Sequence, residues 1–112
     1  AVANGIYAGG GMMFAPGARP DDGLMDVLLA CELTRAVILR ELPRIRRGAH
    51  LANPNVRTMR ASRVRIETLS TGALPLEADG NMRGHTPADF QIMPGALRII
   101  SPHQRAQGSS DE

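Results

Sequence analysis

Hydrophobic positions recur at every second residue along much of the chain, the period of a strand with one face toward a core. The clearest case is residues 56–68, where Val, Ile and Thr alternate with Arg and Glu. Residues 2–14 alternate more loosely and are interrupted by the glycines Gly9, Gly10 and Gly11. Glycines within a strand mark a bulge, a sharp bend or the close approach of another backbone. Both segments predict strands.

Turn-forming residues separate the apolar segments at short intervals. Residues 15–23 are dense in Pro, Gly and Asp and predict a loop, while Asp79-Gly80 and Pro94-Gly95 indicate tight hairpin turns. An apolar run of strand length, residues 24–31, follows the loop. About seven or eight short strands with such spacing are typical of an antiparallel sandwich or barrel. We expect one domain over residues 1–102 and a polar, disordered tail over residues 103–112.

One segment, residues 34–47, changes to helical spacing. Thr34 is a suitable N-cap, and Gly48 is a stop signal after an arginine-rich last turn. Pro43 should kink the helix or end it early. The apolar stripe, which includes Val37, Ile38, Leu42 and Ile45, predicts that the helix packs on a sheet.

Composition narrows the possible functions. Only 3% of the residues are aromatic, which argues against a single-stranded nucleic-acid binder that stacks bases. All 13 basic residues are arginine, and the net charge is +2. This composition suits binding to phosphates and acidic lipid headgroups. Alternatively, the use of arginine alone reflects a residue preference of the source. The single cysteine, Cys31, ends an apolar run, and we expect a buried small hydrophobe in a reducing compartment.

Three groups of residues could carry chemistry. A phosphate-binding loop is followed by a helix, and no helix is predicted after Gly9–Gly11. We therefore interpret these glycines as a structural bulge in the strand. Asp21 and Asp22 suit a hard cation or a solvated turn. Glu77 and Asp79 lie two apart on a predicted strand, which would place both carboxylates on one face, where one could serve as a general base. Spacing alone does not decide between these alternatives.

The order of the motifs resembles the second domain of bacterial diacylglycerol kinases, a family related to sphingosine kinases and more distantly to NAD kinases. The matching segments are Asn4–Met12, Ala15–Val27, Leu42–His50, Ala78–Gly80 and Pro94–Pro102. The resemblance implies a β-sandwich with one packed α-helix, the second domain of a two-domain, ATP-dependent lipid kinase. The family's nucleotide motif, Gly-Gly-Asp-Gly-Thr, does not occur in this chain. We therefore expect the nucleotide-binding N-terminal domain to be absent and this chain alone to be inactive.

The resemblance also implies roles for individual residues. Asp79 matches the acid that takes the proton from the lipid hydroxyl. Asp22 of the Asp21-Asp22 loop would donate its carboxylate to a metal, with main-chain carbonyls from Arg19 and Leu24. Tyr7, Gly9, Gly10, Gly11 and Met12 would line the cleft between the domains. ATP and Mg²⁺ would be required, and the enzyme would act on a lipid alcohol at the cytoplasmic face of an anionic membrane.

One position departs from the family pattern. The family usually continues Asp-Gly-Glu, whereas this chain has Asn81 after Asp79-Gly80. Asn carries no charge and cannot replace the family Glu as a base or a charged metal ligand. Either Glu77 takes the place of that Glu, or the metal network is weaker in this chain, or the substrate differs. The alternatives are a sphingoid-base kinase domain and a non-catalytic lipid-binding module.

Overall fold

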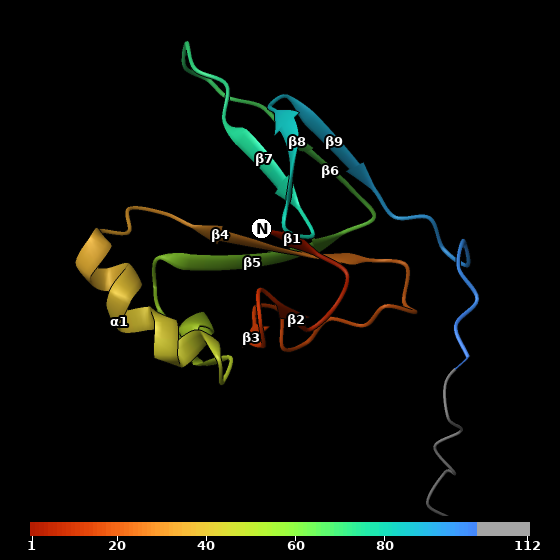
Figure 1. Ribbon diagram of the computed structural model, residues 1–112, viewed down its shortest axis with the longest axis horizontal. Coiled ribbons are helices and arrows are strands. Elements are labelled where there is room, and N and C mark those ends of the chain that lie inside the picture. Colours follow the sequence, from red (N-terminus) through yellow and green to blue (C-terminus); the bar gives the residue numbers. More distant parts are fainter. Residues whose placement is uncertain (101–112) are drawn as a thin grey trace, which may run out of the picture.

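The computed structural model describes residues 1–100, so the tail expected over residues 103–112 lies outside the described residues. The described chain forms nine strands, one α-helix and one 3-10 helix (Figure 1). The strands are β1 (Val2–Ala3), β2 (Tyr7–Ala8), β3 (Met12–Met13), β4 (Met25–Ala30), β5 (Val56–Ala61), β6 (Arg63–Ile66), β7 (Pro75–Ala78), β8 (Asn81–His85) and β9 (Ala88–Gln91). The helices are α1 (Arg35–Ile45) and η1 (Ala49–Ala52). The mainly β architecture with one α-helix is confirmed.

A three-stranded sheet in the order β1-β4-β5 forms the centre of the molecule. All its pairings are antiparallel, with Val27 of β4 opposite Val2 on one side and Met59 on the other. The central strand β4 is largely apolar, and its residues Met25, Val27 and Leu28 are buried. The edge strand β5 keeps its arginines exposed.

The remaining strands form antiparallel pairs, β2–β3, β6–β9 and β7–β8. In the view of Figure 1, β6–β9 and β7–β8 lie on one side of the three-stranded sheet, and α1 lies with β2–β3 on the other. This arrangement is consistent with the predicted β-sandwich-like fold. The Asp79-Gly80 pair forms the two-residue turn between β7 and β8, as expected.

Helix α1 begins as predicted. The hydroxyl oxygen of Thr34 accepts a hydrogen bond from the Val37 amide at 3.3 Å. The helix continues through Pro43 but ends two residues later at Ile45, before the predicted limit at Arg47. Gly48 follows with a φ of 68°, a left-handed conformation that stops the helix.

The inward face of α1 differs from the predicted stripe. Val37, Glu41 and Ile45, spaced four residues apart, are its more buried positions, whereas Ile38 and Leu42 are exposed. The helix packs on η1 and faces the sheet across a pocket rather than lying directly on it. The buried face of α1 thus follows a four-residue spacing, and one of its three residues, Glu41, is charged.

The described core is small. Ala15, Ala18 and Leu28 form its buried cluster, with Ala3 and Ile6 packed against it. Two of these residues come from the loop over residues 15–23, which thus contributes to the core. Several large apolar side chains remain well exposed: Tyr7, Leu39, Leu69, Met82, Met93, Leu97, Ile99 and Ile100.

Cys31 is exposed, so the prediction that it is buried was wrong. It lies one residue beyond the end of β4, where the sheet no longer covers the chain. Its amide donates to the carbonyl oxygen of Asn55, and this contact holds the backbone without burying the thiol.

Candidate functional site

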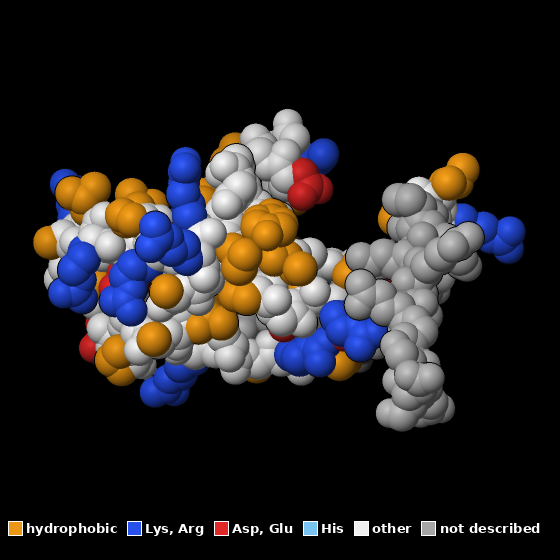
Figure 2. All heavy atoms as spheres, turned by 90° about the horizontal axis from the view of Figure 1, so that it is seen from below, with side chains coloured by type: hydrophobic (Ala, Val, Ile, Leu, Met, Phe, Trp, Pro, Cys, Tyr) orange, Lys and Arg blue, Asp and Glu red, His pale blue; other side chains and the backbone are white. Residues whose placement is uncertain are grey.

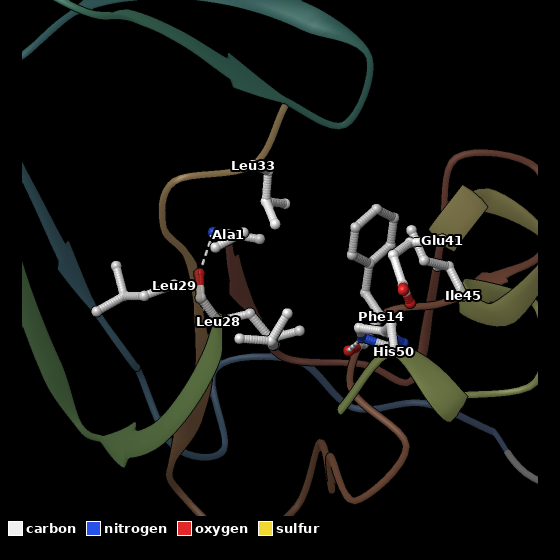
Figure 3. Close-up of a pocket in the computed structure, with 10 residues that line it drawn as sticks. Ala1, Phe14, Leu28, Leu29, Leu33, Glu41, Ile45 and His50 are labelled. Carbon is white, nitrogen blue, oxygen red and sulfur yellow. Dashed lines mark hydrogen bonds between the residues drawn. The ribbon is translucent and has the colours of Figure 1, made fainter. Parts of the chain in front are cut away.

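An apolar pocket of about 360 Å³ lies between α1 and the three-stranded sheet. Its lining consists of Ala1, Phe14, Leu28, Leu29, Ala30, Leu33, Glu41, Ile45, His50 and Val56. Figure 3 shows Phe14, Glu41, Ile45 and His50 on one side and Ala1, Leu28, Leu29 and Leu33 on the other. A pocket of this size with mostly apolar walls and a few polar groups is typical of a small-molecule site.

The two polar side chains of the pocket are both buried, at 4% exposure each. The His50 ring places Nε2 at 3.0 Å from the main-chain oxygen of Phe14. Since a carbonyl oxygen only accepts, Nε2 must donate, which leaves Nδ1 of the neutral ring as an acceptor. Among the described residues Nδ1 has no hydrogen-bond partner. Nδ1 is thus an unpaired acceptor buried in the pocket wall.

Glu41 is held by arginines from its own helix. Its Oε1 accepts a hydrogen bond from Arg44 at 3.4 Å, and Arg40 approaches the same oxygen to 3.7 Å. Oε2 lies 3.4 Å from Nε of Arg44 but has no hydrogen bond of good geometry within residues 1–100. Oε2 of Glu41 is thus a second buried acceptor in the same wall.

Sequence reasoning missed both polar residues. The signal for Glu41 was its position four residues from Val37 and from Ile45, on one helix face. The predicted apolar stripe instead included Ile38 and Leu42, so Glu41 was not assigned to the buried face. His50 stood alone in the sequence, and its partner is a main-chain oxygen that no side-chain motif reveals.

The glycines Gly9, Gly10 and Gly11 form the turn of the β2–β3 hairpin, which pairs Ala8 with Met12. All three have positive φ, which side chains rarely adopt, so the sharp-bend interpretation is confirmed. The hairpin leads directly to Phe14 in the pocket wall. Of the predicted cleft residues, Tyr7 is 62% exposed and Met12 is half-buried.

The hairpin also contacts the end of α1. A side chain at Gly48 would come within 2.6 Å of Cγ of Pro16 and 3.1 Å of the sulfur of Met13. The glycine therefore allows the segment after β3 to lie against the α1–η1 junction. This contact brings the predicted cleft residues and the pocket to one region of the molecule.

The predicted catalytic carboxylates lie on a different hairpin. Glu77 is in β7, but Asp79 is in the turn with a φ of 51°, so strand alternation does not place them on one face as predicted. Asn81 donates from Nδ2 to the main-chain oxygen of Asp79 at 3.1 Å. Both carboxylates are exposed, and no hydrogen bond or ion pair joins them to another side chain among residues 1–100.

The Asp21-Asp22 loop lies before β4. Oδ1 of Asp22 accepts the Leu24 amide at 3.0 Å, and Oδ2 contacts the guanidinium of Arg60. Asp21 faces Nε of Arg19 at 3.5 Å on the surface. Burial raises the pKa of the Asp22 carboxyl, but the Leu24 amide and Arg60 outweigh that effect and hold the pKa below its ordinary value.

Residues 1–101 match the protein family described as the YegS C-terminal NAD kinase beta sandwich-like domain. A diacylglycerol kinase of Mycobacterium tuberculosis is 35% identical over 94 residues, covering 84% of this chain and 29% of that protein. A probable lipid kinase YegS-like protein of Chromohalobacter salexigens is 33% identical over 106 residues, covering 95% of this chain and 33% of that protein. The diacylglycerol kinase of Bacillus subtilis is 23% identical over 103 residues, covering 92% of this chain and 33% of that protein.

The chain thus spans about a third of the length of these relatives. No solved structure matches it. Within residues 1–100 no helix has the length and apolar composition needed to cross a membrane. From the family match and the identity to these relatives, the chain belongs to the YegS C-terminal NAD kinase beta sandwich-like family, the C-terminal domain of bacterial diacylglycerol kinase and YegS-like lipid kinases.

Proposed function

We propose that this chain is the lipid-binding domain of an ATP-dependent kinase that phosphorylates the hydroxyl of diacylglycerol or a related lipid. The observation that carries the proposal is the apolar pocket between α1 and the sheet, with two buried polar side chains in one wall. Apolar walls suit part of a lipid chain. Nδ1 of His50 and Oε2 of Glu41 are both acceptors, so they suit a donor group of the ligand rather than an ester oxygen.

The proposed base is Asp79. In phosphoryl transfer a carboxylate orients the hydroxyl and receives its proton as the oxygen attacks the γ-phosphoryl group. Mg²⁺·ATP would supply the phosphoryl group and charge neutralisation, bound mainly by the N-terminal domain. The exposed turn leaves the Asp79 carboxylate free to enter a site completed by that domain. Glu77 is the proposed second carboxylate, in place of the family Glu at Asn81.

The N-terminal domain is also the proposed cover for exposed apolar surface. Tyr7 at 62% and Met82 at 65% exposure lie on the two hairpins that carry the predicted cleft and base. Exposed large apolar groups on segments with a predicted function are typical of an interface. We therefore place the interdomain cleft along the Tyr7–Met12 hairpin and the Asp79 turn.

Helix α1 is the proposed membrane contact, at the cytoplasmic leaflet. Ile38, Leu39 and Leu42 are exposed on it at 45%, 70% and 42%. Figure 2 shows arginine side chains interspersed with hydrophobic ones at this end of the molecule. Arg46 and Arg47 follow the helix and, among the described residues, have no ion pair. Apolar side chains bordered by arginine suit an anionic membrane surface.

A non-catalytic lipid-binding module is the second candidate, and Asn81 favours it. Its amide holds the Asp79 turn in place of the charged group that the family pattern carries there. A sphingoid-base kinase is the alternative within the enzyme class, because the same pocket suits a single-chain amino alcohol.

Binding of a fluorescent diacylglycerol analogue to the 112-residue chain tests the pocket. We expect Ala30→Phe, which fills the pocket, to weaken binding by at least about tenfold through steric exclusion. Ala73→Phe, at an exposed position before β7, is the matched control and should bind as the unaltered chain does. Equal binding by all three proteins would exclude this pocket as the lipid site.

A further inference from the structure

Arg60 and Asp26 are direct cross-strand partners in the three-stranded sheet. The register pairs Asp26 of β4 with Arg60 of β5, so the two side chains leave the sheet on the same side. Nε of Arg60 lies 3.5 Å from Oδ1 of Asp26. The Asp26 side chain is 16% exposed, which makes this a partly buried ion pair.

The same guanidinium reaches the loop before β4. Its NH2 group contacts Oδ2 of Asp22, a carboxylate that is 18% exposed. Arg60 thus bridges two carboxylates, one in the loop and one in the sheet. The Leu24 amide occupies the remaining oxygen of Asp22. The loop is tied to β5 through a side chain that is always charged.

The arrangement does not fit a divalent cation. Mg²⁺ needs about six oxygen ligands in octahedral geometry. Within residues 1–100 no group of three or more His, Cys, Asp or Glu side chains is gathered to hold a metal, so a cation here would depend on Asp22, main-chain carbonyls and water. Both oxygens of Asp22 already have partners, the Leu24 amide and Arg60, and the Asp21 carboxylate faces the Arg19 guanidinium. A cation placed at Asp22 would also lie beside the positive guanidinium, which repels it.

We propose that Arg60 is the internal counter-ion of this loop and takes the place of a divalent cation at Asp21, Asp22, Arg19 and Leu24. Arg60 balances one of the two negative charges from within the chain, and Oδ2 of Asp26 is left without a hydrogen-bond partner among the described residues. The loop then keeps its structure when metal is removed. This inference concerns the loop alone, so it stands or falls separately from the proposed kinase activity.

Thermal unfolding of the 112-residue chain tests the inference, in EDTA and in excess MgCl₂ or CaCl₂. We expect the midpoint of the unaltered chain to differ by less than about 2 °C among these conditions. Arg60→Met should lower the midpoint in EDTA by roughly 4–8 °C. Excess Ca²⁺ or Mg²⁺ should restore part of the loss, since Asp22 and Asp26 have then lost their shared counter-ion.

Arg57→Met is the matched control. Arg57 lies on the same strand, is exposed and has no ion pair among the described residues, so its loss should shift the midpoint by less than about 2 °C. Broadening of amide signals by Mn²⁺ in the unaltered chain provides a measurement that needs no variant, and we expect none at residues 19–26. A rise of several degrees with Mg²⁺ in the unaltered chain, or selective broadening at those residues, would overturn the inference and favour the metal site.

Discussion

His50 donates its Nε2 hydrogen to the main-chain oxygen of Phe14, with 3.0 Å between the two heavy atoms. The bond joins η1 to the segment after the β2–β3 hairpin, 36 positions apart in the sequence. Because both residues line the pocket, this single bond positions one of its walls.

His50→Leu should lower the free energy of unfolding by about 1–3 kcal/mol, because the partly buried Phe14 oxygen is then left without a donor. Urea unfolding followed by circular dichroism measures the change. His85→Leu, at an exposed position of β8, is the control and should change stability by less than about 0.5 kcal/mol. Equal stability of the two variants would contradict the role given to His50.

Gly48→Ala should destabilise the chain by about 1–3 kcal/mol, because the new methyl group meets Pro16 and the backbone has a φ of 68°. Gly17→Ala is the matched control, since nothing lies within 4 Å of a side chain there and its φ is not positive. Unfolding midpoints in urea compare the two. A Gly48 variant as stable as the Gly17 variant would mean that the α1–η1 junction does not pack on Pro16.

Asp79→Asn in the complete gene product should reduce kcat for lipid phosphorylation by about 10²–10⁴-fold, the usual loss on removing a general base. The fold should be unchanged, because the exposed carboxylate has no hydrogen bond or ion pair with another described side chain. Glu32→Gln, at another exposed position with positive φ, is the control. Retained activity in the Asp79 variant would remove it from the mechanism.

Replacing Arg46 and Arg47 together with Gln should weaken binding to anionic vesicles by roughly thirtyfold, at about 1 kcal/mol for each charge. Vesicle sedimentation measures the partition, and the difference should shrink at high salt. Arg57 and Arg83, exposed on strands, give a control double variant with the same change in charge. If both double variants bind alike, net charge rather than the α1 end governs the contact.

Local signals in the sequence predicted local structure well. Thr34 caps the helix, Gly48 stops it, and Asp79-Gly80 makes a hairpin turn, because each depends only on neighbouring backbone. The exposure of Cys31 and the buried face of α1 could not be predicted in this way, since both depend on where the sheet ends and what lies opposite.

The candidate site was less predictable than the fold. The Asp79 turn was expected from its glycine, yet that turn removes Asp79 from the strand face assumed for it. The His50–Phe14 bond and the bridge made by Arg60 join segments far apart in sequence. Such pairings follow from register and packing, which a short motif does not encode.

The most direct test is ATP-dependent phosphorylation of diacylglycerol in mixed micelles, by the complete gene product and by the 112-residue chain in parallel. We predict activity in the complete product and none in the chain alone, because the nucleotide-binding half is required. Absence of activity in both, with diacylglycerol and with sphingosine, would contradict the kinase assignment and support the non-catalytic lipid-binding module.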